Sequence, residues 1–544
     1  MALSSIRSRS LAAAARRVLA PRVLPTRTPQ RLPLGARSFS RSAPATPARA
    51  SAALRRLTTT AAPAAAEETT ARAVLDALRA DLARKTGGLT PAKLRIVAGW
   101  LGFTAAAVFA MIVLGGITRL TRSGLSMVEW RPEGSKLPST DEEWEVAFDK
   151  YKQFPEYKVV NSRMTLEEFK PIYFMEWFHR MWGRGLGVIF GVPALAFIAS
   201  GMIPPLIRPV VGAAFGLGAA QGAVGWWMVK SGLEERKKDD FREPRVSPYR
   251  LAAHLTVAIT IFSLLSWSTM DCLWAAQRTA ALGAAGGAAV PGLARVLAMQ
   301  PAAAGAGVAT ALAGRAAALA AMSPWAWGAT GLVALTTVAG AFVAGNDAGR
   351  AYNDWPMYAG RMIPEQIWDA TMGVRNFFEN TATVQFDHRN LAYATLAAIA
   401  LAGHRVAKLP QIPPAVRTAT RGMAAAVAVQ VGLGISTLMM YVPVSLGAAH
   451  QAGAMVLLGT GLWLRHAVSA GQREATVASA AMLRNAASGA ASKAAPAATA
   501  ASSALALAAV PTTERPGRDW SAMAAVGSTA RAIASGLRGV QSRL

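Results

Sequence analysis

The chain has 544 residues, a formal net charge of +27 and a hydrophobic fraction of 53%. Its single cysteine excludes an intramolecular disulfide and a metal cluster held by several cysteines. The positive charge is concentrated at the N-terminus, where the segment 1–66 holds twelve Arg and no Lys, Asp or Glu. This Ala- and Ser-rich composition is typical of a mitochondrial transit peptide, which we predict over residues 1–66. We expect no nucleic-acid partner; a basic tail without a targeting role is the alternative.

After a polar segment over residues 67–95, uncharged apolar runs recur along the chain. Roughly twenty such residues cross the hydrocarbon core of a bilayer as a helix. The last run is too long for one span and is interrupted at Pro443, so it predicts two helices, and a weaker segment over residues 388–403 predicts one more. We therefore predict an all-α, polytopic membrane protein with eight transmembrane helices. The apolar runs are 96–118, 185–207, 209–229, 251–270, 316–346 and 422–464.

The charges of the connecting segments predict the orientation of these helices. The segment over residues 118–177 holds nine basic and eleven acidic residues, and residues 346–387 are also acidic on balance. The connection after the predicted sixth helix is basic, as matrix-facing loops are, although the basic connection over residues 230–250 weakly contradicts the assignment. We expect a multi-pass protein of the mitochondrial inner membrane, surrounded by its lipid, with both termini in the matrix.

The two halves of the chain repeat each other. Each half has four predicted helices, an even number, so both halves have the same orientation and form two parallel-duplicated four-helix bundles. We place the bundles at residues 96–274 and 323–468, joined by a mobile Ala/Gly-rich matrix linker over residues 275–322 and followed by a low-complexity tail over residues 469–544; an amphipathic surface helix is the alternative for the linker. The repeated residues are Gly115 and Gly340, Gly124 and Gly349, Trp130 and Trp355, His179 and His388, Gln221 and Gln430, Gly225 and Gly434, and His254 and His450.

Four of the six histidines fall at the entrances of apolar segments. His179 and His254 lie at similar depth on the second and fourth helices of the first bundle, and His388 and His450 repeat the arrangement in the second. Because helix bundles hold cofactors between facing side chains and His is a common axial ligand of iron, we predict two heme sites. Zinc fits less well, since two histidines leave its coordination incomplete.

Two further histidines serve as an internal control. His404 and His466 each follow a predicted ligand by sixteen residues, which is about 24 Å along a helix. Both should therefore lie near the opposite face of the membrane, where we expect surface histidines.

A carboxylate distinguishes the two predicted sites. Glu176 precedes His179 by three residues and so lies one helical turn away on the same face, while the matching residue in the second half is Gln385. Because a carboxylate beside a cofactor can act as a base or stabilise developing positive charge, the first site is expected to carry out chemistry and the second to transfer electrons. An ordinary interfacial acid is the alternative for Glu176.

Four arginines beside the predicted sites are candidate partners for heme propionates. Arg119 and Arg122 follow the first helix, and Arg180 and Arg389 adjoin two of the histidines. Charge-assisted hydrogen bonds from guanidinium groups would suit propionate carboxylates. Interfacial anchoring or loop salt bridges remain open for each of them.

Three long motifs occur in a fixed order: Gly115-Gly116-Ile117-Thr118-Arg119-Leu120-Thr121-Arg122-Ser123-Gly124-Leu125-Ser126, then Glu176-Trp177-Phe178-His179-Arg180, then Asn346-Asp347-Ala348-Gly349 with Asn353-Asp354-Trp355-Pro356. Together they resemble the heme A synthase family of the mitochondrial and alphaproteobacterial type. The resemblance covers about residues 96–468 and leaves out the presequence, the Ala/Gly-rich linker and the tail.

The resemblance implies an oxidoreductase acting on a CH or CH2 group, which converts heme O to heme A by oxidising the C8 methyl group to a formyl group in two successive hydroxylations. It also implies that His179 and His254 hold heme O, that Glu176 is the catalytic acid residue, and that His388 and His450 hold a permanent heme b. The chain lacks the cysteine pair that some bacterial members carry in the first external loop, so a thiol-dependent mechanism is not implied.

The same resemblance implies a set of partners. Ferredoxin and ferredoxin reductase would supply electrons, heme O synthase would supply the substrate, and the assembly machinery of cytochrome c oxidase would receive heme A; a homo-oligomer is left open. Two other functions also remain open. One is a diheme b-type membrane cytochrome that only transfers electrons, and the other is a transporter, whose usual broken helices in matching positions are mostly absent here.

Overall fold

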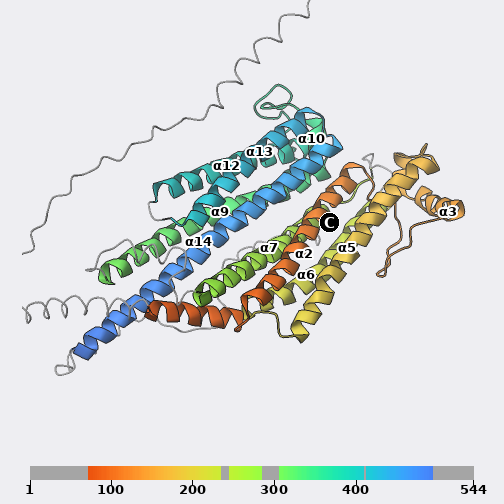
Figure 1. The fold of residues 1–544 in the computed structure, drawn as a ribbon. Helices are drawn as coiled ribbons and strands as arrows, with labels where there is room; N and C mark the ends of the chain where they lie inside the picture. Colours follow the sequence, from red (N-terminus) through yellow and green to blue (C-terminus); the bar gives the residue numbers. More distant parts are fainter. Residues whose placement is uncertain (1–71, 235–243, 285–304, 410–411, 494–544) are drawn as a thin grey trace, which may run out of the picture. The chain divides into compact units, whose positions relative to one another are not determined.

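The computed structural model of the chain describes residues 72–234, 244–284, 305–409 and 412–493 (Figure 1). The transit peptide predicted over residues 1–66 lies outside these ranges. All the described residues belong to one compact unit, which runs from Pro63 to Leu544. Within the described residues the chain is all-helical, as predicted, with one isolated bridge between Tyr358 and Arg361 in place of any strand.

Eight long helices make up most of the described part, and short helices lie in the segments between them. A further helix over residues 72–86 precedes the first long one. The long helices are α2 (Pro91–Leu120), α5 (Leu166–Ala199), α6 (Arg208–Leu233), α7 (Pro248–Ala284), α9 (Gly305–Gly345), α12 (Thr381–Lys408), α13 (Pro414–Met439) and α14 (Val444–Lys493). The short ones are α3 (Asp141–Lys152), α4 (Pro155–Val159), η1 (Pro205–Ile207), α10 (Ala348–Ala351), η2 (Gly373–Arg375) and α11 (Asn376–Glu379).

Helix α5 begins well before the apolar run that predicts it. The side chain of Thr165 accepts a hydrogen bond from the Glu168 backbone N–H, and the Glu168 carboxylate accepts one from the Thr165 backbone N–H at 2.9 Å. This capping box satisfies two of the backbone donors that a helix leaves open at its start. Helix α5 can therefore begin inside the polar segment, and Glu176 and His179 both lie within the helix.

The long helices form two groups of four that follow the order of the chain. Helices α2, α5, α6 and α7 contact one another in sequence, and α7 closes the group against α2; α9, α12, α13 and α14 make the corresponding contacts. The groups meet through α7 against α9, α2 against α14, and α7 against α14 (Figure 1). If the halves are matched in chain order, the first two of these contacts are equivalent to each other.

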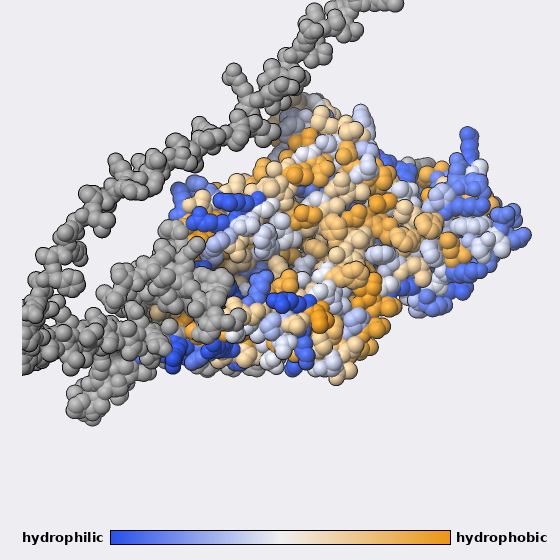
Figure 2. Space-filling view, in the orientation of Figure 1, coloured by the Kyte–Doolittle hydropathy of each residue, from blue (hydrophilic) through white to orange (hydrophobic). Residues whose placement is uncertain are grey.

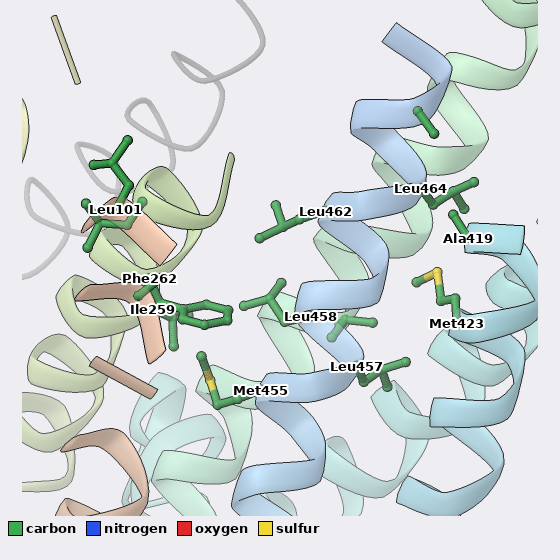
Figure 3. Close-up of a cluster of buried hydrophobic side chains, with 14 of the residues drawn as sticks. Leu101, Ile259, Phe262, Ala419, Met423, Met455, Leu457, Leu458, Leu462 and Leu464 are labelled. Carbon is green, nitrogen blue, oxygen red and sulfur yellow. The ribbon is translucent and has the colours of Figure 1, made fainter. Parts of the chain in front are cut away.

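An apolar layer joins the two groups. Figure 3 shows Ile259 and Phe262 of α7 facing Met455 and Leu458 of α14, and all four side chains are at most 8% exposed. They belong to one buried cluster that includes residues of both groups. Burial of large apolar side chains contributes on the order of 1.5–3 kcal/mol each relative to exposure, so this layer is a major source of contact energy between the groups.

Five helices are long and apolar enough to cross a membrane: α2, α5, α7, α9 and α13, counting only the described residues. The other long helices, α6, α12 and α14, do not meet this criterion over the described residues. The prediction of eight spans is supported for five helices and stays a prediction for the other three.

The Ala/Gly-rich segment predicted as a linker over residues 275–322 is helical at both of its described ends. Helix α7 continues to Ala284 and α9 begins at Gly305, while residues 285–304 lie outside the described part. Helix α14 likewise continues to Lys493, into the segment predicted as a tail. Helix at these ends is closer to the helical alternative for the linker: alanine is the strongest helix former, and these ends bury alanine and leucine against one another. The bounds of the linker and the tail stay a prediction.

A small helical layer covers the start of α5 outside the long helices. Phe148 and Tyr151 of α3 form a buried cluster with Phe169 of α5, and the ring centroids of Tyr151 and Phe169 are 5.2 Å apart. In Figure 2 this end of the molecule is largely hydrophilic, whereas apolar side chains gather over the long helices. The layer therefore lies where the polar segment over residues 118–177 was expected to leave the membrane.

Candidate functional site

The four histidines predicted as ligands lie on four different long helices, and the two members of each predicted pair are near enough to influence each other electrostatically. His179 lies on α5 and His254 on α7, and their rings are within electrostatic range of each other. His388 on α12 and His450 on α14 are related in the same way. The structure therefore brings together each pair that the repeat predicts. Binding of iron by these pairs stays a prediction.

Each of the four imidazoles lies against a glycine of a neighbouring helix. A side chain at these glycines would press on the ring, since a Cβ atom placed there would lie closer to the imidazole than such atoms ordinarily do. The glycines are themselves related by the repeat, so equivalent residues make equivalent contacts in the two halves. The pairs, with the distance from an added Cβ to the imidazole Cε1, are Gly115 and His179 (3.1 Å), Gly225 and His254 (2.8 Å), Gly340 and His388 (3.1 Å), and Gly434 and His450 (2.9 Å).

A glutamine accompanies one histidine of each pair. The Gln221 Nε2 atom lies 3.2 Å from Nε2 of His254, and the Gln430 Nε2 atom lies 3.2 Å from Nδ1 of His450 and donates to the His450 backbone carbonyl at 2.9 Å. Gln221 and Gln430 are also related by the repeat. They were recognised in the sequence only as repeated residues, without a role, and the structure places both at the sites.

Several polar atoms of the two sites are buried without a hydrogen-bond partner. They include Nδ1 of His179, His254 and His388 and the amide oxygens of Gln221 and Gln430. Buried polar atoms are rarely left unpaired, so clusters of them indicate a place where another group is held. The described residues contain no group of three or more His, Cys, Asp or Glu side chains that could hold a metal ion. Two histidines per site suit the axial positions of a porphyrin iron better than zinc.

Glu176 is buried one turn from His179, with both carboxylate oxygens engaged. Its side chain is 3% exposed. Oε2 accepts hydrogen bonds from the Ser126 hydroxyl and the Met127 backbone N–H, each at 2.7 Å, and Oε1 forms an ion pair with Arg180 at 2.6 Å. Burial of a carboxylate is tolerated only with such partners. Glu176 therefore joins α5 to the segment that follows α2, one helical turn from His179, and its role in the first site stays a prediction.

Arg180 holds the same segment through its backbone. Its guanidinium donates to the carbonyl of Met127 at 2.7 Å and to the carbonyl of Glu129 at 2.8 Å, in addition to pairing with Glu176. Arg389 makes the corresponding hydrogen bonds in the second half: it donates to the carbonyls of Asp354 at 3.1 Å and Pro356 at 3.0 Å. Both arginines thus position the loop over their site, and contact with a propionate stays a prediction.

The second half replaces the carboxylate with an amide and changes the direction of the hydrogen bond. Gln385 is 5% exposed and donates from Nε2 to the carbonyl of Tyr352 at 3.4 Å, while its own amide oxygen is buried without a partner. In the first half the Glu176 carboxylate accepts from the backbone N–H of Met127, the residue that the repeat matches to Tyr352. The two loops are therefore held at the same place by groups of different charge.

The other two candidate arginines meet residues of the opposite half. Arg119, at the end of α2, donates to the carbonyl of Ala344 in α9 at 2.8 Å and lies 3.5 Å from the Asp347 carboxylate. Arg122 lies 4.0 Å from the same carboxylate, which also pairs with Arg245 at 2.9 Å. These contacts correspond to the salt-bridge alternative for Arg119 and Arg122. Propionate binding by either residue remains untested.

The expectation that His404 and His466 are both surface residues is confirmed for His404 and wrong for His466. His404 is exposed, but His466 is 6% exposed and its Nε2 lies 3.0 Å from the Asp271 carboxylate of α7. The ring of Trp267 packs edge-on against it, with centroids 5.2 Å apart. His466 is buried because α14 packs against α7 between the halves, a contact that the position of His466 along its own helix does not reveal.

A second buried carboxylate near the first site was missed in the sequence. Glu156 of α4 is 7% exposed and accepts a hydrogen bond from the Tyr151 hydroxyl at 3.0 Å. Burial, followed by the charge of Glu176, raises the pKa of Glu156 to about 7, although the hydrogen bond from Tyr151 opposes the shift. Nothing in the polar sequence around Glu156 distinguishes it from the exposed acids nearby. Only the packing of the small helical layer identifies it.

Gln451 is a further residue that the sequence did not single out. It follows His450 on α14 and donates from Nε2 to the backbone carbonyl of Ile112 on α2 at 3.0 Å. A Cβ atom added to Gly116 would overlap its carboxamide, so the two helices approach closely at this point. Gly115, the residue before Gly116, lies against His179 of the first site. A short chain of contacts therefore links the two sites across the boundary between the halves.

Comparison with known proteins gives consistent matches over the same part of the chain. Residues 98–462 match the COX15-CtaA family model, described as cytochrome oxidase assembly protein. The chain is 47% identical over 382 residues to the heme A synthase COX15 of Arabidopsis thaliana, covering 70% of this chain and 76% of that protein. It is 40% identical over 371 residues to the human heme A synthase COX15, covering 68% and 82%. The heme A synthase of Rhodospirillum centenum is 42% identical over 373 residues, covering 68% and 88%.

Proposed function

The chain belongs to the COX15-CtaA family of cytochrome oxidase assembly proteins, and we propose that it is a heme A synthase. In this proposal it oxidises the C8 methyl group of heme O to a formyl group in two successive hydroxylations, which is the chemistry of an oxidoreductase acting on CH or CH2 groups. The relatives named heme A synthase include plant, mammalian and bacterial proteins. They support the overall activity, while the assignment of residues rests on the two sites described above.

The observation that carries the proposal is the pairing of two matched histidine sites with a single carboxylate. Each site has two imidazoles seated against glycines, and only the first has Glu176. We assign heme O to His179 and His254, and a resident heme b to His388 and His450. The buried unpaired nitrogens of both sites fit this assignment. A diheme cytochrome that only transfers electrons would not need a carboxylate at one site, Glu176, and an amide at the other.

The residues of the first site would bind, orient and polarise the substrate. When bound, heme O supplies the methyl carbon to be oxidised and the redox chemistry of its iron. His179 and His254 would set the plane of the macrocycle, and the loop that Arg180 holds would exclude water from one side. Glu176 would take up or release a proton after exchanging its hydrogen bond with Ser126 or Met127 for one with the substrate.

The proposed setting is the mitochondrial inner membrane. The basic, acid-free segment 1–66 supports import, and the acidic segments around the sites support a position facing the intermembrane space. We propose that all eight long helices cross the membrane as two parallel-duplicated bundles over residues 96–274 and 323–468, with both termini in the matrix. Ferredoxin and its reductase are the proposed electron donors, and heme O synthase is the proposed supplier of the substrate.

The decisive experiment replaces Glu176 with Gln and analyses the extracted pigments by chromatography. The protein is expressed in membranes that contain heme O synthase, and heme A, heme O and heme b are measured against wild type. We expect Glu176→Gln to retain heme b and heme O while heme A falls by about 100-fold or more, as for removal of a catalytic group acting on protons. Glu167→Gln is the matched control, because Glu167 lies on the same helix with its side chain 79% exposed. Normal heme A production by Glu176→Gln would contradict the role of Glu176, and pigment containing only heme b in the wild type would contradict the function.

A further inference from the structure

A hollow lies at the end of the helix bundle that is opposite to the four paired histidines. It is open to solvent and offers about 50 Å³ of space for the centres of water-sized molecules. Its walls come from the helix over residues 72–86 and from the ends of α7, α9 and α14, which share one buried apolar cluster (Figure 1). The helix over residues 72–86 and the end of α14 lie outside residues 98–462, so the family match does not account for this hollow.

The wall of the hollow combines apolar and cationic side chains. Leu78 and Leu82 line it from the helix over residues 72–86, and Leu282 and Leu312 line it from α7 and α9. Its charged lining residues are Arg278, Arg315, Arg473, Asp81 and Glu474. A site of this composition suits a ligand that is apolar at one end and anionic at the other.

Both carboxylates of the wall are already engaged. Glu474 forms an ion pair with Arg278 at 2.6 Å and accepts a hydrogen bond from the Trp274 indole at 2.8 Å. Asp81 forms ion pairs with Lys85 at 2.6 Å and with Arg84 at 2.9 Å. Each acid of the wall thus has a cationic partner, and the charge of Glu474 also acts on Arg315. The wall keeps a net positive charge because its three arginines outnumber its two acids.

Two arginines of the wall therefore stay available for an anion. Across the ranges that the structure describes, no carboxylate forms an ion pair with Arg315 or Arg473. The Nε atom of Arg315 is buried without a hydrogen-bond partner, and the Arg473 guanidinium lies 6.0 Å from the centroid of the Trp274 ring. A buried guanidinium nitrogen without an acceptor is costly, and a phosphate oxygen would satisfy it with a charge-assisted hydrogen bond.

The depth of the hollow matches the headgroup region of the opposite leaflet. Arg278 follows His254 on α7, and Glu474 follows His450 on α14, with the same spacing in both helices. At the rise of an α-helix, each spacing corresponds to about 36 Å along the helix axis. The hydrocarbon core of a bilayer is about 30 Å thick. If the histidines lie near one face of the core, Arg278 and Glu474 lie just beyond the other.

We propose that this hollow is a binding site for an anionic phospholipid of the matrix leaflet. The phosphate would lie between Arg315 and Arg473, and an acyl chain would lie against Leu78, Leu82 and Leu312. Basic pockets between membrane helices on the matrix side are suited to such headgroups. Because α7 and α14 carry His254 and His450 at their other ends, the bound lipid would fix the helices that hold one histidine of each site. The inference rests on the proposed orientation in the membrane and not on the heme chemistry.

The test measures lipid binding to the purified, delipidated full-length protein by native mass spectrometry. We expect phosphatidylglycerol to bind at least tenfold more tightly than phosphatidylcholine, and the double variant Arg315→Gln, Arg473→Gln to lose most of that preference. Arg484→Gln is the matched control, since Arg484 lies on α14 outside the wall of the hollow. Arg473→Lys keeps the positive charge at the wall and leaves Arg315 intact, so it should retain the preference within about threefold, which provides a second measurement if the double variant is poorly folded.

Three outcomes would overturn the proposal. Equal binding of the two lipids by the wild type would show that the protein does not select an anionic lipid. An unchanged preference in a folded double variant would show that Arg315 and Arg473 do not form the site. Displacement of phosphatidylglycerol by inorganic phosphate at millimolar concentration would identify a free anion as the ligand. Pigment content is measured on the same samples, so failure of the heme proposal, with only heme b present in the wild type, is distinguished from failure of the lipid proposal.

Discussion

The two halves of the protein hold their histidines alike and hold their covering loops differently. In both, the imidazoles lie against repeated glycines and an arginine binds loop carbonyls. In the first half a carboxylate, Glu176, binds the loop through a backbone N–H and pairs with Arg180; in the second half the amide of Gln385 binds through a carbonyl. The shared features are those that would hold a macrocycle, and the differing one is a charge. Under the proposed function, binding and chemistry would therefore depend on different residues.

The boundary between the halves shows a second difference. Gln451 of α14 crosses to α2 and bonds to the Ile112 carbonyl beside Gly116. At the positions that the repeat matches to Gln451 and Gly116, the chain has Leu255 and Ala341, which cannot form this hydrogen bond. The second site is therefore tied by a polar contact to the helix that also contacts His179. In the other direction, from the first half to the second, the matched residues Leu255 and Ala341 form no corresponding hydrogen bond.

The largest expected effect is the loss of one pigment. His388→Ala or His450→Ala should abolish the low-spin heme b spectrum, because one remaining imidazole cannot supply both axial ligands. Absorption spectra of the purified variants measure this, with His404→Ala as the control because His404 is exposed. An unchanged spectrum in both histidine variants would contradict the division into two sites, and an equal loss in Glu176→Gln would contradict the separation of binding from chemistry.

Substitution of the glycines that contact the imidazoles should weaken heme binding in one half at a time. Gly225→Ala places a Cβ 2.8 Å from His254 Cε1, and Gly434→Ala places one 2.9 Å from His450 Cε1. The ring must shift, so we expect the affinity for heme to fall by about tenfold at the altered site, equivalent to an overpacking cost of about 1–3 kcal/mol. Titration of the apo variants measures it. Gly185→Ala is the control, since nothing lies within 4 Å of the added Cβ; if it weakened binding equally, the contact would not be responsible.

Glu156 should make the first half sensitive to pH. Its pKa is raised from 4.5 to about 7, chiefly by burial, so the folded state favours the protonated carboxyl. The resulting stabilisation is fully present below pH 4.5 and is lost as the pH rises through 7; its full size is on the order of 3 kcal/mol. Unfolding midpoints of wild type and Glu156→Gln, measured between pH 5 and 8, should diverge as the pH rises, with the variant the more stable at pH 8. Parallel curves would show that Glu156 does not titrate in this range.

The smallest effect concerns the contact between the halves. Gly116→Ala should destabilise the protein by about 1–3 kcal/mol, because its methyl group overlaps the Gln451 carboxamide. Gln451→Ala removes the obstacle and one hydrogen bond, at a cost of about 1 kcal/mol. The double variant should therefore be more stable than Gly116→Ala alone, as chemical denaturation would measure. Additive costs in the double variant would mean that these two side chains do not meet.

Much of the candidate site could be predicted from sequence because its pattern is local or repeated. The spacing of Glu176 and His179 on one helix, and the recurrence of Gly225 and Gly434, can be read without coordinates. The roles of Glu156, His466 and Gln451 could not, because each depends on how segments pack: the small helical layer buries Glu156, α7 brings Asp271 to His466, and α2 brings Ile112 to Gln451. The choice between linker and helix stayed open in the sequence for a related reason, since the alanines at the ends of the predicted linker are helical where they pack on other helices.

The sequence by itself determined the helical class, the histidine pairs, the acid at only one of them and the family. These features follow from composition, from a helical period and from a repeat, which are all properties of the chain in one dimension. Only the tertiary structure decided what Glu176 and the four arginines bind, how the halves meet, and that a cationic hollow lies at the far ends of α7, α9 and α14. Hydrogen bonds and burial depend on distances between segments that the chain brings together only on folding.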